Sequence, residues 1–154
     1  MRRIRRKFER PKRPWDSIRI KDEKEIVKEY GLRRKKEIRS AEAILRGFRQ
    51  RARELIAMED PEKEKTLIDK LVKLGMLKSD KSELDDVLGL NVKDILNRRL
   101  QTIVFNKGFS KTPKEARQFI VHGHVKIEGN KIPFPSYIVS VEEEGKIKME
   151  KGFK

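Results

Sequence analysis

The sequence predicts an α+β fold, in which a basic N-terminal arm and a helical scaffold precede a small module of two helices and an antiparallel sheet. Apolar side chains recur every three or four positions over residues 35–58, which is typical of one face of a long helix. Residues 112–123 begin with Thr-Pro and end at a glycine, as a capped helix does. Residues 124–132 then alternate apolar and polar side chains up to a Gly-Asn pair, which indicates a β-hairpin.

The charge of the chain predicts a polyanionic partner. Among 154 residues, 40 Lys and Arg oppose 25 Asp and Glu, and the net charge is +15. The basic excess lies in residues 1–58 and 98–154, whereas residues 59–97 are slightly acidic, so we expect two anion-facing surfaces on a supporting element. No apolar run approaches the ~20 residues of a membrane span, so we expect nucleic acid rather than a membrane. We find no signal-peptide core, and the absence of cysteine excludes disulfides and fits a reducing compartment.

Residues 1–19 are expected to form a basic arm that becomes ordered on its partner. Eight Lys or Arg precede Trp15, and two prolines interrupt any helix. A solubilising tail or a localisation signal is the alternative, but a lone tryptophan after a basic run indicates docking on a protein body or stacking on a base. The arm residues predicted to contact RNA are Arg5, Arg6, Lys12, Arg13 and Trp15.

Residues 20–97 are expected to form the helical scaffold. The patterns predict helices over residues 20–30, ended by Gly31, over 35–58, and over 61–74, opened by Asp60 and Pro61. A short helix opened by Ser82, with Asp85 as an imperfect capping-box partner, should follow. The helix over 35–58 carries a second, positive face that is predicted to contact phosphates, formed by Lys35, Arg39, Arg46, Arg49 and Arg53.

Residues 98–154 are expected to form the last module. Asn91 should cap one helix over residues 92–107, and Thr112, Pro113 and Glu115 should form a capping box for the next. We then expect a strand from residue 124, a turn at Gly129–Asn130, a strand over 136–141, and a turn and final strand over 143–149.

The histidine pair in "VHGHVKIEGNKI" raises the possibility of a metal or acid–base site. His122 and His124 are the only histidines, and without cysteine they cannot complete the three ligands of a catalytic zinc site. The chain also lacks a P-loop, a G-x-G-x-x-G motif and a nucleophile elbow. Asp85 and Asp86 could hold magnesium, but carboxylates also favour a helix start. We therefore expect no enzyme, no metal, no cofactor and no small-molecule substrate.

The motifs of the C-terminal third resemble the S-four family of RNA-binding domains. The resemblance rests on "RRLQTIVFNKGFSKTPKEARQFIVHGHVKIEGNKIPFPSYIV", with its Arg-Leu pair, Gly-Phe turn, Thr-x-x-x-Ala-Arg-Gln helix and Val-x-Ile-Glu-Gly hairpin. The resemblance implies binding of structured RNA, with a face of cationic and polar side chains. The predicted RNA contacts are Arg98, Arg99, Thr102, Lys107, Lys111, Thr112, Lys114, Arg117, Gln118, His122, His124, Lys126 and Lys131.

The N-terminal segments "RPKRPWD" and "EYGLRRKKEIRSAEAILRGFRQRARELIAM" are similar to the archaeal and eukaryotic type of ribosomal protein in this family. This resemblance implies a cytoplasmic protein of the small ribosomal subunit that binds rRNA early and organises a helical junction of its 5′ domain. It also implies a place beside neighbouring ribosomal proteins near the mRNA entry channel, and a role in translational accuracy. An RNA-modifying enzyme with the same domain and a free RNA-binding regulator are the alternatives.

Overall fold

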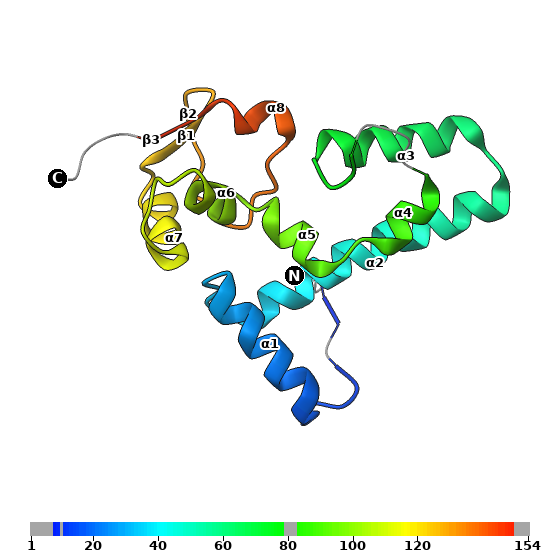
Figure 1. Ribbon diagram of the computed structural model, residues 1–154, viewed down its shortest axis with the longest axis horizontal. Helices are drawn as coiled ribbons and strands as arrows, with labels where there is room; N and C mark the ends of the chain where they lie inside the picture. Colours follow the sequence, from blue (N-terminus) through cyan, green and yellow to red (C-terminus); the bar gives the residue numbers. More distant parts are fainter. Residues whose placement is uncertain (1–7, 10, 79–82, 150–154) are drawn as a thin grey trace, which may run out of the picture.

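The computed structural model describes residues 8–9, 11–78 and 83–149, and it confirms the α+β prediction (Figure 1). Helices precede one small antiparallel sheet, and a last short helix lies in the chain between its second and third strands; the strand order is β2-β1-β3. The helices are α1 (Ser17–Glu29), α2 (Lys36–Met58), α3 (Pro61–Lys73), α4 (Leu84–Gly89), α5 (Val92–Asn97), α6 (Leu100–Asn106), α7 (Pro113–Val121) and α8 (Val141–Glu144). The strands are β1 (Val125–Ile127), β2 (Asn130–Lys131) and β3 (Ile147–Met149).

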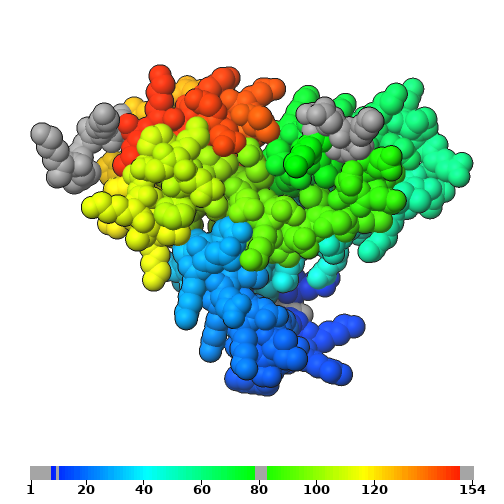
Figure 2. All heavy atoms as spheres, viewed as in Figure 1, coloured from blue at the N-terminus to red at the C-terminus, as the bar shows by residue number. Residues whose placement is uncertain are grey.

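A first apolar core is built on α2. Its predicted stripe is buried from Ile38 through Ala41, Leu45 and Phe48 to Ala52, and α3, α4 and α5 pack against it. Helix α1 adds Tyr30 and the half-buried Ile26 and Val27 from its C-terminal half only. Because the beginning of α1 adds no side chain to this core, it projects from the rest of the molecule (Figure 2, blue).

A second core lies between α6, α7 and the sheet. Leu100, Ile103 and Val104 of α6 contact Ala116 and Ile120 of α7, and the inner faces of β1 and β3 close the cluster. Among the helices that the structure describes, none is both long and apolar enough to span a bilayer.

The predicted single helix over residues 92–107 is wrong, because the chain leaves the helical path at Arg98–Arg99. Arg99 is extended (φ −74°, ψ 142°), and α5 and α6 are separate. The break leaves backbone groups without partners inside a helix, and these groups pair with residues 136–141, the segment that was predicted as a strand. Leu100 N donates to Tyr137 O (2.8 Å), Val139 N donates to Arg98 O (3.0 Å), and a single bridge joins Arg99 to Ile138. No proline or glycine marks this break, so only the tertiary structure reveals it.

Two further boundaries differ from the prediction by one residue. The N-cap of α4 is Glu83, in a capping box with Asp86, rather than Ser82 with Asp85; Ser82 itself lies outside the described residues. The hairpin turn is Glu128–Gly129, both with positive φ (52° and 88°), because Asn130 already pairs with Ile127. In place of the expected turn before the last strand is the short helix α8, which begins at a capping box formed by Ser140 and Glu143.

Candidate nucleic-acid interface

A row of three lysines crosses the outer face of the sheet. Val125 and Ile127 of β1 are buried, so Lys126 between them points to the opposite face. The strand register places Lys131 of β2 and Lys148 of β3 directly opposite Lys126. The strand pairing therefore gathers positive charge on one face of the sheet, which suits a polyanion.

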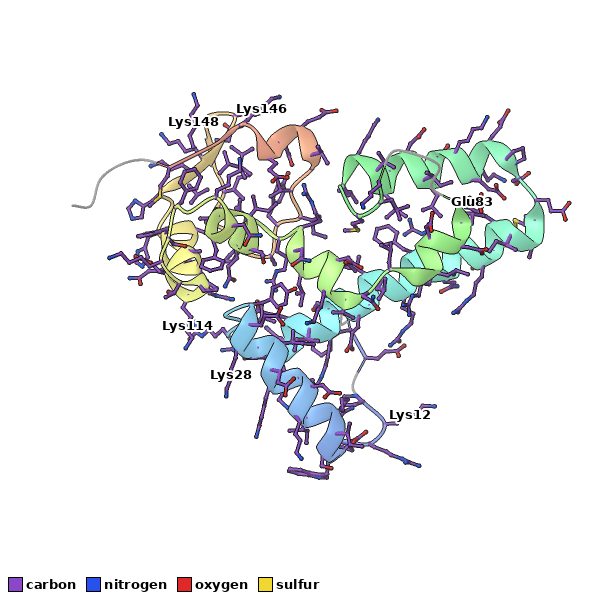
Figure 3. All side chains as sticks on the ribbon, in the orientation of Figure 1. Lys12, Lys28, Glu83, Lys114, Lys146 and Lys148 are labelled. Atoms are coloured by element: carbon purple, nitrogen blue, oxygen red, sulfur yellow. The ribbon has the colours of Figure 1, made fainter. Side chains whose placement is uncertain are left out.

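Lys148 is an addition to the predicted site. The sequence places it in the last strand, but only the pairing of β3 with β1 puts it beside Lys126. In Figure 3, Lys148 and Lys114 lie at the two ends of the same edge of the molecule. The cationic surface therefore extends from α7 to β3.

The two histidines flank the glycine that ends α7. Gly123 adopts a left-handed conformation (φ 77°), which lets Gly123 N donate to Ile120 O and His124 N donate to Phe119 O, both at 3.0 Å. These two bonds form a Schellman motif. The imidazole rings of His122 and His124 lie stacked with centroids 6.3 Å apart. The pair is thus explained by helix termination, and His122 is exposed whereas His124 is half-buried.

One exposed face of α7 leads to this histidine pair. Lys114, Gln118 and His122 are spaced four residues apart, so they lie along one side of the helix, and all three are exposed. Lys111 and Thr112 are exposed just before the helix, where Thr112 Oγ1 accepts a bond from Glu115 N. The predicted reciprocal half of the capping box shifts by one residue, because Glu115 accepts from Lys111 N instead.

This face meets the lysine row at Gly123. A Cβ added there would lie 3.8 Å from Cδ of Lys131, so the Lys131 stem passes beside the histidine pair. We call this surface the lysine–histidine face. Its members are Lys111, Thr112, Lys114, Gln118, His122, His124, Lys126, Lys131 and Lys148.

Three other predicted RNA contacts bind within the chain. Thr102 donates to Leu96 O (2.7 Å), and Lys107, although exposed, donates to the carbonyl oxygen of Glu144. Arg98 is half-buried, pairs with the carboxylate of Glu144 (2.8 Å), and donates to Val139 O (3.0 Å). These contacts attach α6 and the α5–α6 break to the C-terminal segment.

Arg99 and Arg117 converge on one carboxylate, Glu37 of α2. Arg99 Nη2 lies 2.7 Å from Glu37 Oε2, and Arg117 Nη1 lies 3.0 Å from the same oxygen. Only 5% of Arg99 is exposed, so the prediction that it lies on an RNA-facing surface is corrected. The side chain of Arg117 keeps 25% of its surface, and its contact with RNA stays a prediction.

Buried Gln101 completes this polar cluster, which we call the Glu37 junction. Its Nε2 lies 2.9–3.1 Å from the carbonyl oxygens of Pro113, Tyr30 and Gly31, and its Oε1 accepts from Arg117. Burial acts to raise the pKa of the Glu37 carboxyl, but hydrogen bonds from Arg117 and Arg99 outweigh it and hold that pKa below its ordinary value. The junction joins the loop after α1 and the start of α2 to α6 and α7.

The cations of α2 are also largely paired inside the chain. Lys35 binds Glu23 (2.9 Å), Arg49 donates to Leu90 O (2.6 Å), and Arg46 pairs with Glu9. Arg39 lies beside Arg46 in a hollow that also holds Glu23 and Glu42. The face predicted to be almost wholly positive is therefore mixed in charge, and Arg46 and Arg53 are its exposed members.

In the N-terminal arm, the structure places Lys12, Arg13 and Trp15 on the exposed surface. Arg5 and Arg6 lie outside the described residues. The contacts of all five with RNA stay predictions.

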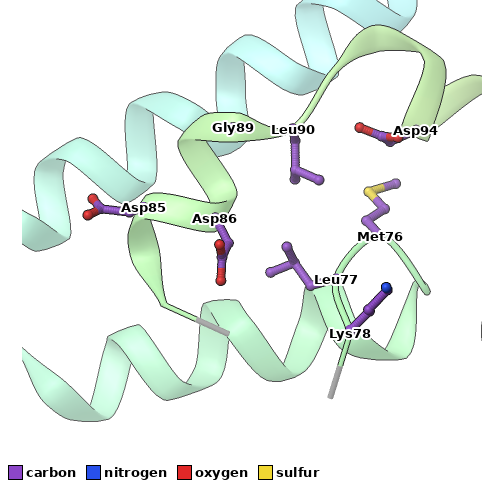
Figure 4. A pocket seen from close by; sticks show the side chains of 8 residues that line it. All are labelled: Met76, Leu77, Lys78, Asp85, Asp86, Gly89, Leu90 and Asp94. Carbon is purple, nitrogen blue, oxygen red and sulfur yellow. The ribbon is translucent and has the colours of Figure 1, made fainter. Parts of the chain in front are cut away.

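An acidic groove separates α4 and α5 from the residues that follow α3 (Figure 4). Asp86 and Asp94 line it with Met76, Leu77 and Leu90, and both carboxylates accept bonds at helix starts, from Glu83 N (3.0 Å) and Asn91 N (2.7 Å). Helix capping therefore accounts for these acids, and their charge disfavours phosphate here. Within the described ranges, no group of three or more His, Cys, Asp or Glu could hold a metal ion.

Comparison with known proteins defines the class of this chain. Residues 98–144 match the S4 domain family, so the chain contains an S4 domain. These residues hold α6, α7, the sheet strands β1 and β2, and α8.

The relatives extend the match to the N-terminal half. The small ribosomal subunit protein uS4 of Metallosphaera sedula is 50% identical over 149 residues, covering 95% of this chain and 83% of that protein. The uS4 protein of Nanoarchaeum equitans is 50% identical over 150 residues (94% and 83%), and that of Saccharolobus solfataricus is 47% identical over 146 residues (93% and 81%). The chain belongs to the uS4 family of small ribosomal subunit proteins. This family is structural and RNA-binding, which confirms the expectation of a protein that is not an enzyme.

Proposed function

We propose that this chain is a structural constituent of the small ribosomal subunit that binds rRNA through the lysine–histidine face. As a uS4 protein it belongs to the cytoplasmic ribosome. The observation that carries the proposal is the lysine row, because the strand register gathers three cations on the outer face of the sheet, where cations can bind a phosphate backbone. Polar Thr112 and Gln118 and the two imidazoles add donors for sugar and base contacts.

The proposed roles are divided among three parts of the chain. We infer a basic arm over residues 1–19, a scaffold over 20–97 and the RNA-binding module over 98–154. The apolar clusters around α2 and around α6–α7 support this division. Ile138 is the exception, because it belongs to the module in sequence but packs against the scaffold core.

The test removes the lysine row without disturbing the fold. The variant Lys126→Ala/Lys131→Ala/Lys148→Ala is compared with Lys65→Ala/Lys70→Ala/Lys73→Ala, which removes the same charge from the exposed side of α3. Binding to a transcript of M. sedula small-subunit rRNA is measured by filter retention over a series of salt concentrations.

We expect the row variant to bind more weakly, with a log–log salt slope lowered by about 0.9 for each lost phosphate contact. The α3 variant should keep the wild-type slope. Equal effects of the two variants would mean that net charge alone drives binding, and the lysine–histidine face would then be rejected. Neither variant should be less stable than the wild type in urea unfolding, because no buried side chain is replaced.

A finer proposal concerns where in the small subunit the chain binds and how early it binds rRNA. We propose that the chain binds rRNA early, organises a helical junction in the 5′ domain, and lies near the mRNA entry channel beside neighbouring ribosomal proteins, where it contributes to translational accuracy. Strong binding to protein-free rRNA, with protection from hydroxyl radicals confined to one 5′-domain junction, would support this. Binding that requires other small-subunit proteins to be present first would contradict an early role.

A further inference from the structure

The tryptophan of the basic arm is presented to solvent. Trp15 is 90% exposed, and Ile18, on the first turn of α1, is 72% exposed. The sequence left two roles open for this ring, docking on the protein body or stacking on a base. The exposure excludes docking on its own chain among the residues that the structure describes.

The segment that carries Trp15 is nevertheless held to α1. Arg19 Nη2 donates to the carbonyl oxygens of Arg13 (2.8 Å) and Pro14 (3.1 Å). These bonds attach the turn that precedes α1 to the helix. Asp16 Oδ1 accepts from Ile18 N (3.2 Å) and Arg19 N (3.4 Å) and so caps the helix. The indole is therefore carried by a fixed turn, which lowers the entropy lost when it binds.

The surroundings of the ring are cationic. Lys12 and Arg13 are exposed in the same turn, and the nearest acid in sequence, Asp16, is engaged in the cap. The first half of α1 buries no apolar side chain, since its only buried residue is Glu23, which binds Arg19 and Lys35. This end of α1 projects from the body (Figure 2), so a ligand can approach it from solvent.

We propose that Trp15 is a nucleobase-stacking site, which takes an unpaired base of the rRNA while Lys12 and Arg13 hold the adjoining phosphates. The proposal rests on the proposed function and adds a second RNA contact, on α1, to the lysine–histidine face. A flat apolar ring beside cations matches a base joined to its phosphate, because the stacked base is uncharged and its backbone is anionic. An apolar pocket of a neighbouring protein would have no need of the cations.

The test uses the fact that Trp15 is the only tryptophan of the chain. The full chain is titrated with the M. sedula small-subunit rRNA transcript, and indole emission and its quenching by acrylamide are followed. Trp15→Ala, Trp15→Leu and Trp15→Phe are compared by filter retention at several salt concentrations. Met58→Ala is the matched control, because Met58 is another exposed large apolar residue (65%) and lies at the end of α2, in the scaffold.

We expect RNA to quench the indole emission and to protect it from acrylamide. Trp15→Ala and Trp15→Leu should lose about 5- to 150-fold in affinity at an unchanged salt slope, since a ring but no charge is lost. Trp15→Phe should retain most of the affinity. Met58→Ala should bind as the wild type, and Lys12→Ala/Arg13→Ala should lower the salt slope instead.

Three outcomes would overturn the stacking site. The first is wild-type affinity of Trp15→Ala for the transcript, with the emission of the bound wild type unchanged. The second is full retention of affinity by Trp15→Leu, which would show that an apolar contact suffices. The third is protection of the indole only after other small-subunit proteins are added, which would assign it to a protein partner. If the wild type failed to bind the transcript at all, the proposed function would fall instead.

Discussion

The Glu37 junction and the lysine row use the same kind of side chain in opposite ways. At the junction, two arginines meet one carboxylate inside the chain, and Arg99 is almost fully buried. Across the sheet, three lysines meet one another on the outer face. The first arrangement balances its charge within the fold, whereas the second gathers positive charge on one face of the sheet.

The position of a basic side chain in the fold, rather than the number of basic residues in the sequence, therefore decides whether it stabilises the fold or lies on a surface that can bind a partner. Arg98, Arg99 and Arg49 fall in basic stretches of the sequence, yet each binds a carboxylate or carbonyl oxygen of this chain. Arginine suits this role because its planar guanidinium makes several directed bonds at once. Arg99→Glu would therefore destabilise the fold, so a loss of RNA binding in this variant would not identify an RNA contact.

The largest effect should come from Glu37→Gln, which leaves two guanidinium groups facing a neutral amide. We expect the free energy of unfolding in urea to fall by about 3 kcal/mol, because a largely buried ion pair has lost one partner. Glu54→Gln on the exposed side of the same helix is the control and should change it by less than ~0.5 kcal/mol. Similar values for the two variants would remove the structural distinction between junction and surface charges.

A smaller effect is expected from Gly31→Ala, which tests how closely the loop after α1 approaches α7. Gly31 has φ 58°, and an added Cβ would lie 2.8 Å from Cβ of Pro113. We expect a loss of about 2 kcal/mol in calorimetric or urea unfolding. Gly47→Ala inside α2, where a Cβ meets nothing within 4 Å, should instead stabilise by about 0.5–1 kcal/mol. Stabilisation by both substitutions would show that the junction is looser than described.

The smallest effect is the pH dependence that Glu37 adds. Its pKa is lowered in the folded state, so near its ordinary pKa the unfolded chain binds more protons than the folded chain. The stabilisation is therefore present above the ordinary pKa and is lost as the pH falls through the lowered one. We expect the stability gap between wild type and Glu37→Gln to narrow between about pH 5 and pH 3 in urea unfolding. A gap that stays constant over this range would argue against the lowered pKa.

Much of the fold could be predicted because local chemistry determines it. The apolar stripe of α2, the Thr112–Pro113 start of α7 and the glycine end at Gly123 all depend on neighbours within a few residues. The break at Arg98–Arg99 could not be predicted, because its backbone partners lie about forty residues away, at Tyr137 and Val139.

The sequence by itself determined the charge of the chain, its helix caps, its strand alternation and the motifs of its RNA-binding domain, because each is written in composition or short spacing. The tertiary structure decided which basic side chains are buried in ion pairs and which gather on the outer face of the sheet. Glu37 lies 62 residues from Arg99 and 80 from Arg117, and Lys148 lies far along the chain from Lys126. Burial and charge pairing depend on such long-range contacts, which no local pattern records.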